Sequence, residues 1–341
     1  MDMSRLRRRL TLQLLTAASL LAVFGAVGVA QAQSKLVVYS ANDSTLNDLV
    51  FGAFTKEVGI AVDPVAAGSG VLVRRLQSEK ARPQADILWG VSRSLLQTNK
   101  GLFEAYASTN KGATPSEYRD PDDLWIGNNL HLLVILQNTK LVPDGQGPKS
   151  WADLLDPKWK GKIAFTDPAN SGSAYQTVTM LVDLWGGGDA GWKKVAQLFK
   201  NMKVLNRSSL VFQGVGNGEY PLGISLEYAG PLWASNGAPV KVIYPADGTT
   251  FSMEGVAIIK GGPNNASAKA FVDYINRKDT REMILKATFR RPTRSDLDLS
   301  KLPGGLPPLS SVKLLNYDED GWTDKRAPTM EKIKDVLQDS R

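Results

Sequence analysis

The chain has 341 residues, of which 43% are hydrophobic and none is cysteine, and its formal net charge is +7. The absence of cysteine excludes disulfides, thiolate metal sites and cysteine nucleophiles, so stability must come from packed cores. The charge is mild and scattered, which argues against a nucleic-acid partner. Because the length exceeds what one hydrophobic core supports, we expect two lobes of roughly 120 to 180 residues each.

Residues 1–32 have the pattern of a Sec-type signal peptide. Four arginines precede an apolar run from Leu14 to Ala30, and Ala30 and Ala32 are the small residues that signal peptidase reads. An uncleaved membrane anchor is the alternative, but the run holds several small and polar residues and ends in a cleavage pattern rather than a charged stop. We predict cleavage after Ala32, a periplasmic mature protein and, because residues 1–32 carry four Arg and one Asp, a mature charge of about +4.

Strands and helices alternate in the first part of the mature chain. Residues 36–39, 60–65 and 85–89 are short runs typical of strands; between them, helical spacing predicts one helix that stops at Gly59 and another that opens at 68–70. This alternation predicts a mostly parallel sheet with helices on both faces. Ligands of such sheets bind at the carboxyl ends of the strands.

The second part contains an apolar run at residues 130–136 that is long enough to cross between two lobes. A helix is predicted to follow 171–173 and to end at the glycines 186–188. Further strands are predicted at residues 163–165, 223–226, 240–244 and 255–259, the last two leading back to the first lobe.

In this order, the segments resemble the periplasmic solute-binding proteins of ABC importers, in the branch that binds ferric ion and organophosphates or phosphonates. The match rests on Val38–Asn42 through Phe54–Thr55, Gly68–Gly70 with Ala85–Gly90, Asp153–Gly161, Asn170–Ser173 and Arg290–Arg294. The resemblance implies an α/β, type II-like periplasmic binding protein whose two lobes are joined by crossover hinge strands. It also implies a monomer without a cofactor, with a small anionic solute and an inner-membrane ABC permease as partners.

The resemblance further implies where the lobes lie. We expect lobe 1 to be discontinuous, at residues 34–130 and 250–285, and lobe 2 to occupy residues 131–249. Residues 286–341 are expected to form a C-terminal helical segment that packs on the lobes.

The ferric members of the branch use a His, a Glu and two adjacent tyrosines, and this chain departs from that pattern. The His position holds Asp43, the Glu position holds Val91, and the tyrosine pair corresponds to Glu227 and Tyr228. A ferric ion wants several anionic oxygens, which Asp43, Glu227 and Tyr228 would supply. We therefore favour no metal and keep a ferric-binding receptor with a synergistic anion as the alternative.

The anion site of the branch is better preserved. Ser171, Gly172 and Ser173 stand at the helix start that holds the anion in the ferric members, and Ser208 and Ser225 align with anion contacts. A helix start offers unpaired N–H groups to an anion. Each serine alone is equally compatible with an ordinary helix cap.

Other candidates concern the second lobe face and the organic part of the ligand. Ser69 opens a comparable helix in the other lobe, and Glu227, beside Tyr228, would accept bonds from sugar hydroxyls or pair with an ammonium, as in 2-aminoethylphosphonate. Glu227 in a surface salt bridge and Trp89 in the core are the structural alternatives. The remaining ligand-site candidates are Ser40, Asn42, Trp89 as a stacking platform and Glu254, which is expected just before a strand.

Enzyme signatures are absent from the sequence. The only histidine, His131, lies in an apolar strand run and is expected to be structural, and there is no nucleophile elbow, zinc-protease motif or Walker loop. We therefore predict a phosphoryl- or phosphonate-binding receptor rather than an enzyme. A secreted lyase or hydrolase that uses Tyr and Glu is the alternative of another class.

Overall fold

The computed structural model describes residues 35–299 and 302–340, so the predicted signal peptide lies outside the described residues. No helix within these ranges is long and apolar enough to cross a membrane. The strands are β1 Lys35–Ser40, β2 Ala61–Ala66, β3 Ile87–Ser92, β4 Phe103–Glu104, β5 Ile126–Asn138, β6 Ile163–Thr166, β7 Met202–Leu205, β8 Leu222–Leu226, β9 Val240–Ile243, β10 Phe251–Ile259 and β11 Arg291–Pro292. The helices are α2 Ser44–Val58, α3 Ser69–Ser78, α4 Arg93–Thr98, α5 Gly172–Leu184, α6 Gly188–Asn201, α7 Ser208–Gly216, α8 Ala229–Ser235, α9 Asn265–Ile275, α10 Lys278–Thr288, α11 Glu319–Asp324 and α12 Arg326–Asp339.

The strands are hydrogen-bonded in the order β2-β1-β3-β10-β5-β8-β6-β7, with β4, β9 and β11 attached beside this path. β1 runs parallel to β2 and β3, and β6 runs parallel to β7 and β8, as the alternation of strands and helices predicts. β10 is antiparallel to both β3 and β5. The sheet is therefore mixed rather than mostly parallel, because the chain returns through β10.

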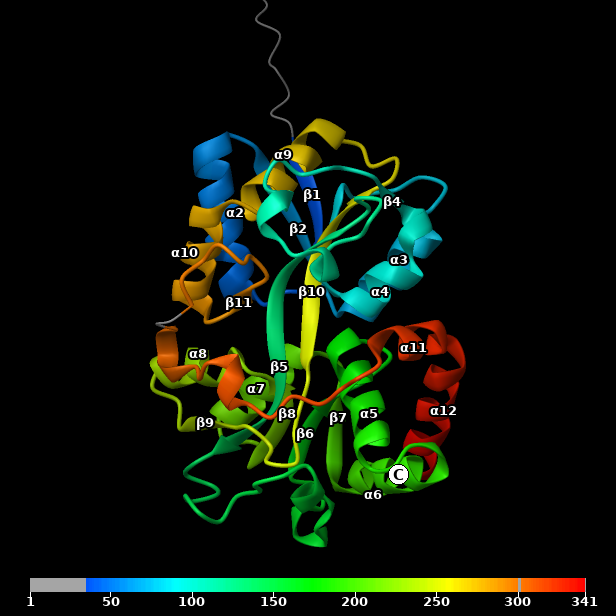
Figure 1. The fold of residues 1–341 in the computed structure, drawn as a ribbon, viewed down its shortest axis with the longest axis vertical. Helices are drawn as coiled ribbons and strands as arrows, with labels where there is room; N and C mark the ends of the chain where they lie inside the picture. Colours follow the sequence, from blue (N-terminus) through cyan, green and yellow to red (C-terminus); the bar gives the residue numbers. More distant parts are fainter. Residues whose placement is uncertain (1–34, 300–301, 341) are drawn as a thin grey trace, which may run out of the picture. The chain divides into compact units, whose positions relative to one another are not determined.

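The described residues form two α/β lobes joined by β5 and β10, as Figure 1 shows. One end of β5 pairs with β10 and β11 and its other end with β8 and β9, so this strand belongs to both halves of the sheet. Separate apolar cores lie on the two sides, one around Trp89 and Phe271 and one around Trp151 and Phe165. The expected two-lobed architecture with crossover strands is confirmed, while the residue limits given for the lobes stay predictions.

Helix ends lie where local chemistry places them. The Asp43 side chain accepts a hydrogen bond from the Leu46 N–H at 3.1 Å and caps α2, and Gly59 ends that helix with a φ of 76°. Ser171 caps α5 in the same way, by accepting from the Ala174 N–H at 3.3 Å. Each cap gives an acceptor to an N–H group that the helix itself leaves unpaired.

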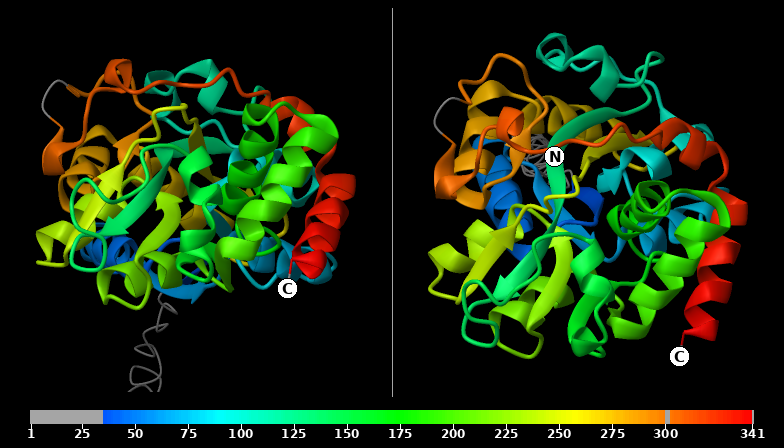
Figure 2. Two further views of the ribbon diagram at one scale, coloured as in Figure 1. Left: turned by 90° about the horizontal axis from the view of Figure 1, so that it is seen from below. Right: turned by 60° about the horizontal axis from the view of Figure 1, so that its bottom comes forward.

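The C-terminal segment connects the lobes on their outer side, where α12 lies beside α6 and α11 lies beside α4 (Figure 2). On α5, the Tyr175 hydroxyl donates to the Trp322 carbonyl oxygen at 2.7 Å. On α4, Arg93 forms ion pairs with Glu319 and Asp320. Burial raises the pKa of Glu319 to about 7, although Arg93 opposes that rise.

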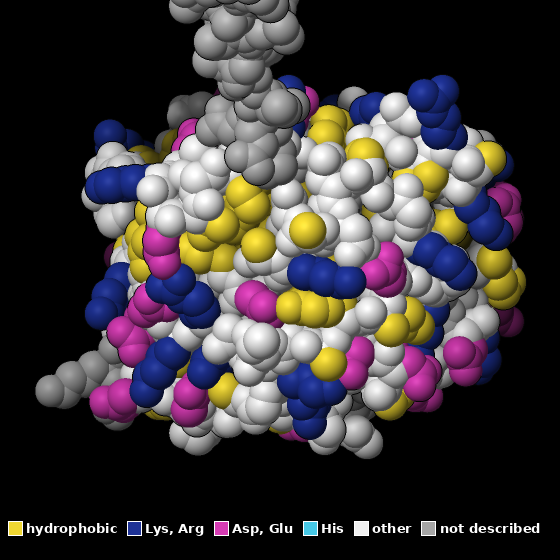
Figure 3. All heavy atoms as spheres, turned by 90° about the horizontal axis from the view of Figure 1, so that it is seen from above, with side chains coloured by type: hydrophobic (Ala, Val, Ile, Leu, Met, Phe, Trp, Pro, Cys, Tyr) yellow, Lys and Arg dark blue, Asp and Glu magenta, His cyan; other side chains and the backbone are white. Residues whose placement is uncertain are grey.

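Charged side chains of both signs are intermixed on the face shown in Figure 3. Basic and acidic side chains lie close to one another there, with apolar side chains between them. This face offers no broad basic patch for a polyanion. The predicted absence of a nucleic-acid partner stays a prediction.

Candidate functional site

A polar pocket lies between the lobes, where the strands of both end. Parallel strands place their carboxyl ends at one edge of a sheet, and the turns after β1, β2, β6, β7 and β8 all reach this pocket. β3 and β10 supply the remaining wall. The lining residues are Ala41, Asn42, Asp43, Ala67, Gly68, Ser69, Gly90, Ser92, Asn170, Ser171, Gly172, Ser173, Arg207, Ser208, Ser209, Phe212, Leu226, Tyr228 and Glu254.

The lobe 2 wall combines two helix N-termini with a run of hydroxyls. The Ser171 hydroxyl is 3.1 Å from that of Ser173 and 3.2 Å from that of Ser208, so the starts of α5 and α7 share one hydrogen-bonded network. The first N–H groups of a helix have no acceptor within the helix, and the helix dipole is positive there. At α5, Ser69 accepts from the Gly172 N–H, and the Ala174 N–H donates to the capping serine. The wall therefore offers an anion the serine hydroxyls, the remaining N–H groups and the positive ends of the two helix dipoles.

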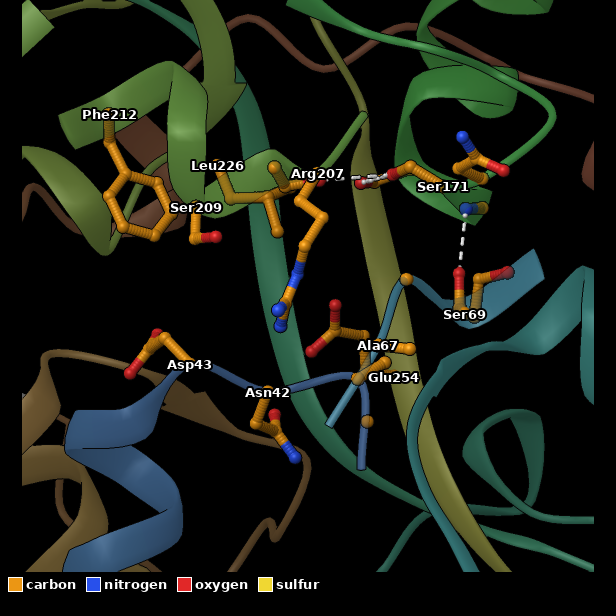
Figure 4. Close-up of a pocket in the computed structure, with 18 of the residues that line it drawn as sticks. Asn42, Asp43, Ala67, Ser69, Ser171, Arg207, Ser209, Phe212, Leu226 and Glu254 are labelled. Atoms are coloured by element: carbon orange, nitrogen blue, oxygen red, sulfur yellow. Dashed lines mark hydrogen bonds between the residues drawn. The ribbon is translucent and has the colours of Figure 1, made fainter. Parts of the chain in front are cut away.

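Arg207, directly before α7, adds a full positive charge. Its guanidinium points into the pocket, toward the side where Asp43 and Glu254 lie (Figure 4). It forms no ion pair with another residue in the part of the chain that the structure describes. A solute anion is thus the natural partner of this guanidinium.

The opposite wall is built around Asp43. Arg290 pairs with its carboxylate and the Tyr228 hydroxyl donates to it at 3.1 Å, while the Arg290 guanidinium lies 3.6 Å from the Tyr228 ring centre. Burial alone would raise the pKa of Asp43, but Arg290 together with the hydrogen bonds from Leu46 and Tyr228 outweighs burial, and the pKa falls below its ordinary value. Burial raises the pKa of Tyr228 well above its ordinary value, so its hydroxyl stays protonated as a donor.

Glu254 is the second carboxylate of this wall. It lies within β10 rather than before the strand as expected, because β10 begins three residues earlier, at Phe251. One of its oxygens is 3.0 Å from His131 Nε2, and the His131 ring centre lies 5.0 Å from that of Tyr228. His131 therefore positions Glu254, which leaves the other carboxylate oxygen to a ligand.

The lobes also touch each other directly beside the pocket. The Gly172 N–H donates to the Ser69 hydroxyl at 3.0 Å, and the Gly70 N–H donates to the Asn170 carbonyl oxygen at 3.1 Å. A Cβ at Gly70 would lie 2.2 Å from the Ala169 carbonyl oxygen, so only glycine permits this approach. The structure thus shows the lobes closed on each other.

The structure brings most of the predicted ligand residues to this pocket and leaves four outside its lining. Ser40 is buried and bonded to Asn47 at 2.7 Å, and Trp89 packs in the lobe 1 core against Phe51 and Phe271. Ser225 lies in a small adjoining pocket. The predicted residues that line the main pocket are Asn42, Ser69, Ser171, Gly172, Ser173, Ser208, Tyr228 and Glu254.

Glu227 is the fourth predicted ligand residue that lies outside the pocket lining, and its placement corrects the sequence interpretation. Its carboxylate is buried in an ion pair with Arg291, at 2.6 Å, and accepts a hydrogen bond from the Tyr244 hydroxyl at 2.7 Å. An arginine that lies 64 residues away in the sequence thus engages this carboxylate. Asp43, Glu227 and Tyr228 therefore do not converge as a ferric ligand set.

Arg207 and Ser209 are pocket residues that the sequence interpretation missed. They follow β7, whose four residues were not predicted as a strand, so their position at a strand end was hidden. The short run Val204–Leu205 before a polar turn was the available signal. Phe212 and Leu226 were also missed, and they form the apolar part of the lining.

Two α/β lobes, two crossover strands and a polar pocket at the strand ends define a two-lobed solute-binding protein. The chain belongs to the family of bacterial extracellular solute-binding proteins, whose sequence pattern matches residues 82–319. The members of this family bind solutes and are not catalysts, in agreement with the prediction.

Individual relatives agree with this assignment. An uncharacterized protein of Haemophilus influenzae is 29% identical over 321 residues, which cover 89% of this chain and 91% of the relative. A Salmonella typhimurium protein whose name refers to periplasmic 2-aminoethylphosphonate binding is 27% identical over 298 residues, covering 82% and 85%. The fructose-6-phosphate-bound periplasmic binding protein AfuA of Actinobacillus pleuropneumoniae is 26% identical, with a TM-score of 0.82 over 90% of this chain and 99% of that one.

Proposed function

We propose that this protein is the periplasmic receptor of an ABC importer and captures a small phosphorylated or phosphonate solute between its lobes for an inner-membrane permease. The observation that carries the proposal is that a single pocket combines the Arg207 guanidinium with the N-termini of α5 and α7. The names of the Salmonella and Actinobacillus relatives refer to a phosphonate and to a sugar phosphate, which supports the same class of ligand.

The opposite wall selects the organic part of the ligand. Asp43 already accepts bonds from Arg290, Tyr228 and the Leu46 N–H, so its capacity is nearly filled. Glu254 has one oxygen engaged by His131 and the other available. A solute with its anion on the Arg207 side and an ammonium or hydroxyl beside Glu254 satisfies both walls.

The size of the closed pocket favours a short organic part. Within the closed pocket, the centre of a water molecule can occupy a volume of about 50 Å³. This exceeds the roughly 10–15 Å³ that a cavity needs to hold one water, so the closed pocket admits a small solute. 2-Aminoethylphosphonate therefore needs less widening of the cleft than a hexose phosphate does.

The ferric alternative receives less support. In the described ranges, no group of three or more His, Asp or Glu side chains is arranged to hold a metal ion. Asp43 and Tyr228 meet, but both are already hydrogen-bonded or ion-paired, and Glu227 is engaged by Arg291. A hard trivalent ion would have to displace these partners.

Calorimetry with matched ligands tests the proposal. 2-Aminoethylphosphonate and ethylphosphonate share the anion but differ in the ammonium, and glucose 6-phosphate and ferric citrate represent the other ligand classes. We expect Arg207→Gln to weaken both phosphonates. We expect Glu254→Gln to weaken only 2-aminoethylphosphonate, because only this ligand loses a charge pair.

The exposed Glu219→Gln serves as the matched control, since it makes the same chemical change outside the pocket. Binding of ferric citrate with no binding of any phosphoryl compound would overturn the proposal. If Glu254→Gln weakened the binding of both phosphonates equally, the anion site would stand, but Glu254 would not be the residue that recognises the ammonium.

A further inference from the structure

Four arginines from α10 and the residues after it are buried in lobe 1 near the crossover strands. Three have a carboxylate partner: Arg290 pairs with Asp43, Arg291 with Glu227, and Arg294 with Asp296. The fourth, Arg281, is only 1% exposed and has no acidic partner among the described residues.

The contacts of Arg281 leave most of its donors unused. Its Nη2 donates to the Asn128 carbonyl oxygen and to Asn129 Oδ1. Its Nε and Nη1, the Nε and Nη1 of Arg290, and Nδ2 of Asn129 are buried without a hydrogen-bond partner in the described part of the chain. Asn129 Nδ2 lies close to the Arg281 guanidinium, because Arg281 Nη2 donates to Oδ1 of the same Asn129 side-chain amide.

Arg290 lies near Arg281, because β11, which begins at the next residue, pairs with Asn129, and Asn129 contacts Arg281. Burial, followed by repulsion from Arg290 and Arg294, lowers the pKa of Arg281 to about 9. A guanidinium that stays charged at neutral pH and is fully buried is strongly destabilising unless a counter-charge accompanies it. Water would satisfy the N–H groups but would leave that charge unopposed.

We propose that Arg281, Arg290 and Asn129 bind a small monovalent inorganic anion, such as chloride, inside lobe 1. We infer a small ligand because Arg281, Arg290 and Asn129 are at most 1% exposed, and a monovalent one because Arg281 alone of the four arginines lacks a carboxylate partner among the described residues. This site is separate from the solute pocket, whose lining includes none of the three residues. It touches the pocket wall indirectly, because Arg290 also anchors Asp43.

Crystals of the unaltered protein grown in bromide provide the direct test. Anomalous scattering at the bromine edge should show a peak within hydrogen-bond distance of Arg281 and Asn129. Melting curves at fixed ionic strength should show the melting temperature rising by about 2 °C for each tenfold rise in chloride above its Kd, and no such rise in gluconate.

Variants identify the residue and separate this site from the solute pocket. Arg281→Met should abolish the chloride dependence, whereas Lys286→Met, which removes an exposed charge from the same helix, should retain it. Arg207→Gln should retain it as well, which excludes chloride in the solute pocket as its cause. The absence of a bromine peak at Arg281, or equal melting temperatures in chloride and gluconate, would overturn the proposal even if Arg281→Met fails to fold.

Discussion

Gly70→Ala is expected to block closure of the lobes without harming either lobe. The new Cβ would lie 2.2 Å from the Ala169 carbonyl oxygen and 3.1 Å from its carbonyl carbon, atoms of the opposite lobe. Ordinary contact lies beyond about 3.4 Å, so the lobes must part by roughly 1 Å at this point. Within α3, where Gly70 is the second residue, helix propensity does not disfavour alanine relative to glycine.

The expected loss of affinity follows from that overlap. Forcing a methyl group into a packed contact is destabilising by about 1–3 kcal/mol. Because the overlap exists only in the closed state, this free energy is subtracted from ligand binding. At 1.4 kcal/mol for each factor of ten, the Kd should rise about 5- to 150-fold.

Calorimetry with 2-aminoethylphosphonate measures the affinity, and small-angle scattering with and without ligand measures closure. Gly52→Ala in α2 is the matched control, because nothing lies within 4 Å of its added Cβ. This control makes the same substitution within a helix and should keep the parent affinity. A Gly70→Ala protein with the parent Kd and the parent scattering profile would refute closure through this contact.

Three further predictions test the walls and the C-terminal segment. Replacing Ser171 and Ser173 together by Ala should weaken phosphonate binding by about 1–3 kcal/mol in calorimetry, and unchanged affinity would place the anion elsewhere. Glu227→Gln leaves Arg291 buried without a carboxylate, so denaturant unfolding should show a loss of about 3–5 kcal/mol, whereas unaltered stability with lost binding would restore Glu227 to the ligand site. The pKa of Glu319 is about 7 in the folded state, against an ordinary value of 4.5. Between these pH values the folded state therefore binds more protons than the unfolded state, and the contribution of Glu319 to stability falls as the pH rises. Melting curves should therefore show Glu319→Gln gaining stability relative to the parent from pH 4.5 to 7 and levelling off above it, and a constant difference would contradict the assignment.

The fold was predictable from local signals in the sequence. Alternating apolar runs and caps such as Asp43 and Gly59 act over a few residues, so they appear in the sequence itself. The return of the chain through β10 was predicted as a route back to lobe 1. Its antiparallel direction was not, because strand direction depends on how the lobes are connected.

The candidate site was predictable where it depends on helix starts, as at Ser171 and Ser69. It was not predictable where it depends on partners far apart in the sequence. His131 and Glu254 are 123 positions apart, and Glu227 and Arg291 are 64 positions apart. No local pattern distinguishes a carboxylate that meets a ligand from one that meets a buried arginine.

The position of β10 in the sheet has a consequence for the order of folding. In the sheet, β10 lies between β3 and β5 and forms hydrogen bonds with both. Until β10 is present, the edges of β3 and β5 that face it lack this partner strand. Synthesis of the chain from Ser92 to Phe251 takes about 10–30 s at 5–20 residues per second. The first lobe therefore stays unfinished until about three quarters of the chain has been made. Such late completion is compatible with the export expected from residues 1–32, since a chain that crosses a membrane through the Sec pathway must do so before its tertiary structure forms.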